Sequence, residues 1–136
     1  MTDSLGYRMK FGVIAPSTNT SVQPEYDAMR PYGVTNHFSR CVIPDTKVKS
    51  DADFMVMLNN IRAAVEPAIR SVMSSSPDHI IMGMSAETFW DGLEGQRKLE
   101  RRIEKICGHR VTMGSDAMGA ILRPWYRSGP NTRPRG

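Results

Sequence analysis

The sequence predicts an α/β protein: a three-layer sandwich in which a four-stranded, mainly parallel sheet carries helices on both faces. Short apolar runs alternate along the chain with amphipathic segments of helical period. The apolar runs are bounded by turns rich in Pro, Gly, Ser and Asp, as the buried strands of parallel sheets commonly are. This alternation favours parallel strands joined by right-handed helical crossovers, with helices on both sides of the sheet.

The first part of the chain supplies two predicted strands and a helix between them. Residues 9–15 form an apolar run that ends at Pro16 and a hydroxyl-rich turn, which predicts a buried strand. Residues 21–29 have apolar side chains at helical spacing, and Pro24 is tolerated near the start of a helix. Residues 34–43 are rich in β-branched and aromatic residues, which predicts the second strand.

A longer helix is predicted from residue 50 onward. Ser50 or Asp51 is the expected N-cap, and Pro67 is expected to kink the helix or split it. The apolar stripe of this helix consists of Phe54, Met57, Leu58, Ile61, Val65, Ala68, Ile69 and Val72.

The region from residue 79 onward again alternates predicted strands with predicted helices. Residues 79–84 predict a third buried strand and residues 110–113 a short fourth one. Between them lies an amphipathic helix that Gly108 ends, and a final helix is expected from Ala117. The apolar positions of the helix before Gly108 are Leu99, Ile103 and Ile106.

Two regions are expected: a globular domain over residues 1–122 and a tail over residues 123–136. The tail is rich in Pro and Arg and has almost no aliphatic residue to bury, so we expect it to be disordered. No apolar run is long enough to span a membrane, and the N-terminus lacks the apolar stretch of a secretion signal. These features predict a cytoplasmic protein without a membrane partner.

Charge and cysteine content argue against nucleic-acid binding and against a metal site. Residues 1–120 hold 14 Lys and Arg against 14 Asp and Glu, so the net charge of +4 comes from the tail. Cys41 and Cys107 fit neither a disulfide framework nor a zinc spacing, although His37 and Cys41 share one face of a strand. We expect no metal, and we expect both cysteines to be structural.

The candidate site lies where the four predicted strands end. In an open parallel sheet, ligands bind beyond the carboxyl ends of the strands, where helix N-termini converge. The expected ring of hydroxyl, amide and backbone donors suits a small anion such as a carboxylate. The same residue types are also ordinary helix N-caps, and Glu87 fits a first-turn dipole role, so this alternative stays open. The candidate ligand-binding residues are Ser17, Thr18, Asn19, Gly83, Met84, Ser85, Ala86, Glu87 and Ser115.

Several other chemistries lose their main sequence support. The chain contains no G-x-G-x-x-G after a strand, no G-x-x-x-x-G-K-[ST], no G-x-S-x-G and no H-E-x-x-H. Nucleotide-binding, α/β-hydrolase and zinc-protease functions are therefore not expected.

Three segments carry a family resemblance. FGVIAPSTNTSVQPE resembles the opening strand and turn of maleate isomerases, and IIMGMSAETFWDG the third strand and loop of arylmalonate decarboxylases. VTMGSDA is similar to the fourth strand end of the same aspartate/glutamate racemase superfamily. The resemblance covers residues 10–120 and implies one lobe of a normally two-lobed, pseudo-symmetric fold.

The resemblance implies an isomerase, racemase or decarboxylase that acts on a small mono- or dicarboxylic acid, such as maleate or an arylmalonate, without a cofactor. It makes Asn19 a carboxylate ligand. Racemases and isomerases use one Cys from each lobe, whereas the position after the third strand here is Ser85. The resemblance therefore favours a decarboxylase-like arrangement, in which Ser85 and nearby N–H groups stabilise a carboxylate or an enolate.

The resemblance ends near Ala120, so we expect a truncated half that lacks turnover because the cysteine of the second lobe is missing. Two alternatives stay open. The first is a flavodoxin-like FMN- or anion-binding module, since a Ser/Thr/Asn-rich first turn can hold a phosphate. The second is a non-catalytic half-domain that forms a homodimer through the surface that a second lobe would cover.

Overall fold

The computed structural model describes residues 3–45, 47–84, 92–114 and 117. The expected final helix from Ala117 and the expected tail over 123–136 lie outside these residues, apart from Ala117 itself. The described elements are β1 (Met9–Pro16), α1 (Val22–Met29), β2 (Val34–Cys41), α2 (Asp51–Met73), β3 (His79–Met82), α4 (Gly92–Cys107) and β4 (Val111–Met113).

The four strands form one sheet in the order β2-β1-β3-β4, and every neighbouring pair is parallel. β1 lies in the middle and pairs over eight positions with β2, from Met9 opposite Val34 to Pro16 opposite Cys41. Because all strands run the same way, their carboxyl ends lie at one edge of the sheet, as the alternation of the sequence predicts.

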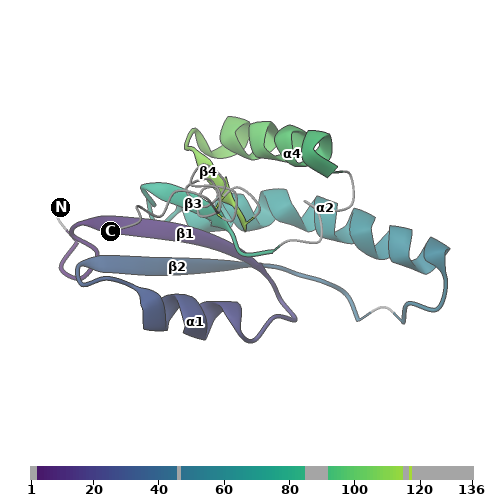
Figure 1. Cartoon of the computed structure of the whole chain (residues 1–136), viewed down its shortest axis with the longest axis horizontal. Helices are drawn as coiled ribbons and strands as arrows, with labels where there is room; N and C mark the ends of the chain where they lie inside the picture. The colour runs from purple at the N-terminus through teal and green to yellow at the C-terminus, as the bar shows by residue number, and fades with distance from the viewer. Residues whose placement is uncertain (1–2, 46, 85–91, 115–116, 118–136) are drawn as a thin grey trace, which may run out of the picture.

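Helices cover both faces of the sheet, which confirms the predicted three-layer α/β fold. Figure 1 shows α1 on one side of the sheet and α2 and α4 on the other. α2 contacts β1 and β2 and packs along α4, which in turn contacts β4. The α2 connection between β2 and β3 passes across β1, so the chain crosses the middle of the sheet once.

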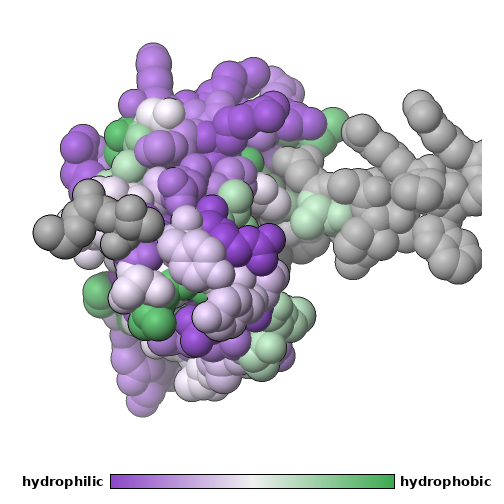
Figure 2. Space-filling view, turned by 90° about the vertical axis from the view of Figure 1, so that its left-hand side faces the viewer, coloured by the Kyte–Doolittle hydropathy of each residue, from purple (hydrophilic) through white to green (hydrophobic). Residues whose placement is uncertain are grey.

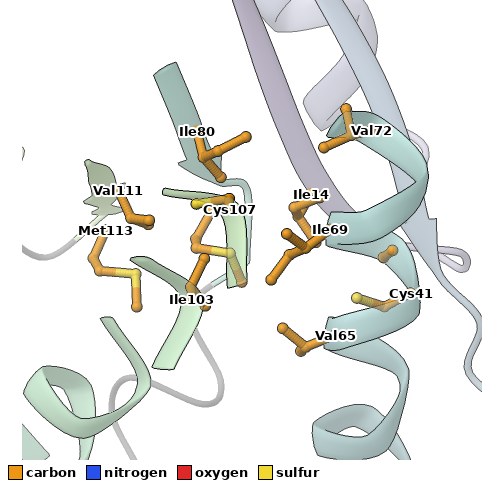
Figure 3. Close-up of a cluster of buried hydrophobic side chains, with 12 residues drawn as sticks. Ile14, Cys41, Val65, Ile69, Val72, Ile80, Ile103, Cys107, Val111 and Met113 are labelled. Carbon is orange, nitrogen blue, oxygen red and sulfur yellow. The ribbon is translucent and has the colours of Figure 1, made fainter. Parts of the chain in front are cut away.

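The main core lies between the sheet and the α2/α4 layer (Figure 3). Alternate residues of each strand point to it, because side chains along a strand alternate between the two faces. The apolar stripe predicted for the long helix supplies one side of this core. The cluster contains Ile14, Cys41, Val65, Ala68, Ile69, Val72, Ile80, Met82, Ile103, Cys107, Val111 and Met113.

Helix α2 begins at the predicted cap. Ser50 accepts a hydrogen bond at Oγ from the backbone N–H of Asp53 (3.2 Å) and donates to Asp53 Oδ2 (2.8 Å). This reciprocal pair satisfies a backbone donor that the first turn leaves without a partner. The hydrogen bond from Ser50 is also the main reason that the pKa of Asp53 lies below its ordinary value.

Of the two expected effects of Pro67, a kink or a split, the structure contradicts the split. α2 runs through Pro67 as one element of 23 residues. Pro67 and Ala63 both lie on the exposed side of the helix, so water can bind the Ala63 carbonyl that the proline leaves without a donor. Burial of the opposite face then keeps the helix continuous.

Helix α4 ends where the sequence predicts. Gly108 has a φ of +70° and donates its backbone N–H to the carbonyl of Glu104 (2.8 Å), which is the usual way in which glycine stops a helix.

The strands β2 and β3 are each two residues shorter than predicted. The residues beyond them, 42–45 and 83–84, are therefore available to form loops at the carboxyl edge.

Candidate functional site

A cleft of about 740 Å³ lies at the carboxyl edge of the sheet. Residues that end or follow all four strands line it, which confirms that the strand ends meet at one place. These residues are Pro16, Thr18 and Asn19 after β1; Ile43, Pro44 and Asp45 after β2; Met82, Gly83 and Met84 at β3; and Gly114 after β4. Val22 and Tyr26 of α1 and Met57 and Ile61 of α2 complete its wall.

The opposite end of the molecule differs in character. Figure 2 shows the side from which β1 and β2 begin, and hydrophilic residues cover most of it. There Arg8 donates from Nη1 to the carbonyl of Tyr32 (3.0 Å), in an exposed contact between two loops. Arg8 therefore makes the same type of contact as an arginine near the cleft would, but at the opposite end of the sheet.

Asn19 lies two residues before Ser21, the N-cap of α1, and its side chain both satisfies backbone donors at the start of this helix and lines the cleft. Its Oδ1 accepts hydrogen bonds from the backbone N–H groups of Ser21 (3.0 Å) and Val22 (2.9 Å) at the start of α1. Because Oδ1 must face these two donors, the amide has only one orientation that satisfies them. Nδ2 is left as the free end, and it has no acceptor among the described residues.

Ser17 connects the loop after β1 to the loop after β2 by hydrogen bonds. Its Oγ accepts a hydrogen bond from the backbone N–H of Ile43 (2.9 Å), and its own N–H donates to the carbonyl of Cys41 (2.8 Å). Ser17 is exposed and is absent from the cleft lining, whereas Thr18 and Asn19 line it. Of these three adjacent residues, Ser17 links the loops after β1 and β2, whereas Thr18 and Asn19 line the cleft.

Gly83 lies where β3 passes closest to α1. Its backbone N–H donates to the carbonyl of Ile14 (2.8 Å), which extends the β1–β3 pairing by one residue. A Cβ at this position would lie 3.0 Å from Cγ1 of Val22 and 3.2 Å from the carbonyl oxygen of Ile14. These contacts are tighter than ordinary van der Waals distances, so glycine fits the close approach of α1 to the end of β3 without displacing its neighbours.

Arg40 is the residue that the sequence analysis missed. It lies at the end of β2, and its Nη1 donates to the carbonyls of Asn19 (2.8 Å) and Pro16 (3.2 Å). Its Nη2 donates to Oε1 of Gln23 in α1 (2.8 Å). In the sequence it is a single arginine within a predicted strand, and this by itself indicates a surface residue.

The cleft wall is mainly apolar and lacks a cation among the described residues that line it. Asp45, which is exposed, is the one carboxylate on that part of the wall. Tyr26 lies edge-on to Phe38 with ring centroids 6.3 Å apart, and partial burial raises the pKa of its phenol. A ligand in this part of the cleft would therefore meet neutral donors rather than a salt-bridge partner.

Both cysteines lie in the core, away from the cleft. Cys41 is fully buried, and burial raises the pKa of its thiol to about 11, so it stays protonated at neutral pH. Cys107 is also buried, and its Sγ donates to the carbonyl of His109 (3.4 Å). His37, which was considered with Cys41 as a possible metal ligand, forms a hydrogen bond with Oγ1 of Thr35 on its own strand (3.0 Å). Within the described ranges, no three His, Cys, Asp or Glu side chains come together as a metal site.

Four of the predicted site residues, Ser85, Ala86, Glu87 and Ser115, lie outside the described residues. Of the other five, the cleft brings together Thr18, Asn19, Gly83 and Met84.

No helix in the described part of the chain is long and apolar enough to cross a membrane.

Comparison with known proteins identifies the fold. No family model and no curated protein matches the chain. Among solved structures, the maleate cis-trans isomerase of Nocardia farcinica bound to TRIS matches with a TM-score of 0.68 and 17% sequence identity. The match covers 85% of this chain and 48% of that chain, so this chain spans about half the length of the isomerase. The chain therefore has the fold of about half of that isomerase.

Proposed function

We propose that the cleft binds a small carboxylic acid and forms one wall of an isomerase, racemase or decarboxylase site. The observation that carries this proposal is that the turn after β1 and the end of β3 line one cleft, to which both Asn19 and the pair Gly83 and Met84 contribute. Had these turns lain at different edges, no shared ligand site would exist.

The donors near the first turn suit a carboxylate. The free Nδ2 of Asn19 is held in place by its capped Oδ1, so it loses little conformational entropy when it binds a ligand. The backbone N–H groups of Thr18 and Thr20 have no acceptor within the described part of the chain, and Thr18 lines the cleft. These neutral donors match a carboxylate oxygen without the desolvation cost of a buried cation.

The apolar wall supports a proposed role in the reaction as well as in binding. Met57, Ile61 and Met84 give the cleft a low-polarity surface, in which hydrogen bonds to a developing enolate are stronger than in water. One preorganised donor of this kind contributes about 3–4 kcal/mol to transition-state stabilisation in acyl-transfer enzymes. The proposed reaction uses Ser85 and the first-turn donors and requires no metal or organic cofactor.

The fold likeness to a maleate cis-trans isomerase favours a dicarboxylate such as maleate as the first ligand to test. An NMR titration of the ¹⁵N-labelled chain with maleate and with phenylmalonate should shift the amides of Thr18, Asn19, Gly83 and Met84 in a saturable manner. The amides of Arg8 and Gly33, at the other end of the sheet, should not move. Absence of any saturable shift, or equal shifts at both ends, contradicts the proposal.

The flavodoxin-like alternative makes a different prediction. An FMN module would retain visible flavin absorbance after purification, or would quench flavin fluorescence when FMN is added. A colourless protein that leaves flavin fluorescence unchanged excludes this alternative.

A further inference from the structure

Arg40 joins three parts of the site that are separate in the sequence. Its side chain extends from the end of β2 on the face that α1 covers, since the opposite face of β2 carries the core residue Cys41. From there it reaches two carbonyls of the turn after β1 and one side chain of α1.

The guanidinium is itself held in place. The ring of Phe38, two residues earlier on the same face of β2, lies with its centroid 5.6 Å from the Arg40 Cζ. Phe38 in turn is fixed by its edge contact with Tyr26 of α1. A planar cation resting on an aromatic face has few alternative positions, so its hydrogen-bond donors point in fixed directions.

These contacts act on both ends of the first turn. The carbonyl of Pro16 also accepts the N–H of Asn19 (3.1 Å), which closes the turn, and Arg40 binds this carbonyl and that of Asn19. The backbone of Asn19 is thereby held at both its N–H and its C=O. The side chain that leaves this backbone has its Oδ1 fixed by Ser21 and Val22.

We propose that Arg40 is a positioning residue of the cleft: it fixes the backbone of Asn19 and thereby the direction of the free amide end. It acts through Asn19 and has no place in the cleft lining itself. The ligand part of this inference rests on the proposed function, whereas the positioning part concerns the unliganded chain.

The test compares Arg40→Met, Arg40→Lys and the control Arg8→Met. Met keeps the aliphatic contact with Phe38 but has no donor, and Lys keeps the charge but cannot bind three acceptors with a planar fork. Arg8 also donates to a backbone carbonyl, but at the opposite end of the sheet. The first readout is the solvent exchange of the Ser21 and Val22 backbone amides, measured by NMR without ligand.

We expect these two amides to exchange about tenfold faster in Arg40→Met and to an intermediate extent in Arg40→Lys, with no change in Arg8→Met. The maleate affinity of Arg40→Met should fall by about tenfold, with Arg40→Lys again intermediate. If Arg40→Met does not fold, Gln23→Ala removes one acceptor of the fork without touching the sheet and should speed the same exchange by about threefold.

The outcomes separate the two proposals. Faster exchange in the Arg40 variants, with no maleate binding by the unmodified chain, supports positioning and refutes the proposed function. Unchanged exchange at Ser21 and Val22 overturns the positioning role whether or not maleate binds. Equal effects of Arg8→Met overturn it too, because they would reflect a general loss of stability.

Discussion

Asn19 shows why capping and ligand binding are not competing roles for one side chain. Residue types alone left both open for the turn after the first strand. Oδ1 accepts the two backbone donors at the start of α1, and Nδ2 has no acceptor among the described residues, so one amide serves the helix with one atom and offers the other to a ligand. An amide is suited to this division because its two ends have opposite hydrogen-bonding character.

This division predicts different effects for two substitutions. Asn19→Asp keeps an acceptor for Ser21 and Val22 but replaces the free donor with negative charge, so α1 should be retained while maleate affinity falls by at least about tenfold. Asn19→Ala removes both roles and should also lower the free energy of unfolding by about 1 kcal/mol. NMR titration with maleate and urea denaturation measure the two effects. Undiminished maleate binding by Asn19→Asp contradicts the assignment of Nδ2 as a ligand donor.

His79 couples stability to pH. Its Nε2 lies 2.7 Å from Oγ1 of Thr112, which joins β3 to the edge strand β4. Burial lowers the pKa of His79 below the ordinary value of 6.5, and electrostatic repulsion from Arg110, with a smaller contribution from His109, lowers it further. Between that lowered pKa and 6.5 the unfolded chain binds more protons than the folded chain, so folding stability is lost as the pH falls through this range.

We expect the free energy of unfolding to decrease as the pH falls from about 7 through 6.5 towards the lowered pKa of His79, and His79→Gln should flatten this dependence because glutamine does not titrate. Urea denaturation at fixed ionic strength across the range measures the slope. Thr112→Val is the control, since it removes the hydrogen-bond partner and leaves the titrating ring. A slope in His79→Gln equal to that of the unmodified chain would show that other groups cause the pH dependence.

At the scale of elements, the approach of α1 to β3 depends on one glycine. α1 has no buried residue, and its contacts with the rest of the chain come from partly buried side chains such as Val22 and Tyr26. A Cβ on Gly83 would lie 3.0 Å from Cγ1 of Val22, so the Val22 side chain would have to shift by a few tenths of an ångström.

Gly83→Ala should therefore cost about 1–3 kcal/mol of stability and lower maleate affinity, because overpacking at a close contact moves the elements apart. Gly114→Ala is the matched control: Gly114 also lines the cleft, but an added Cβ there meets nothing within 4 Å. Thermal and urea denaturation of both variants make the comparison. Equal stability of the two variants would contradict the tight contact between Gly83 and Val22.

The long helix shows which element features can be predicted from sequence. Its cap and buried stripe follow from local residue types, and both are confirmed at Ser50 and along Leu58 to Val72. The effect of Pro67 could not be predicted, because it depends on whether the carbonyl one turn earlier faces solvent or core. The same limit applies to Arg40, whose partners come from two segments that only the folded sheet brings near it.

At the scale of the whole molecule, self-association at the cleft end stays a prediction. Exposed apolar side chains occur next to cleft residues: Val42, 70% exposed, precedes Ile43, and Val56, 53% exposed, precedes Met57. Exposed apolar side chains favour pairing where they form a contiguous patch, and the dimer prediction requires that these do.

Sedimentation equilibrium should show a concentration-dependent dimer, and Val56→Glu should weaken it by about tenfold because a carboxylate is costly to desolvate in an interface. Met29→Glu, equally polar and on an exposed residue at the far end of α1, is the control and should leave association unchanged. A monomer at every concentration would rule out this surface as a dimer interface.

Local sequence patterns were enough to predict the class of fold, the order of the elements, the main core and the sheet edge at which a site is expected. Periodicity, caps and turn residues act over a few neighbouring positions, and parallel strands are expected from how such units connect. The roles of single side chains came from long-range packing: Ser17 binds the loop after β2, Asn19 lines the cleft, and Arg40 binds the backbone of the turn after β1. These roles depend on which distant segment each donor or acceptor meets, and a hydrogen bond across 21 residues of chain is made by the fold rather than by local sequence.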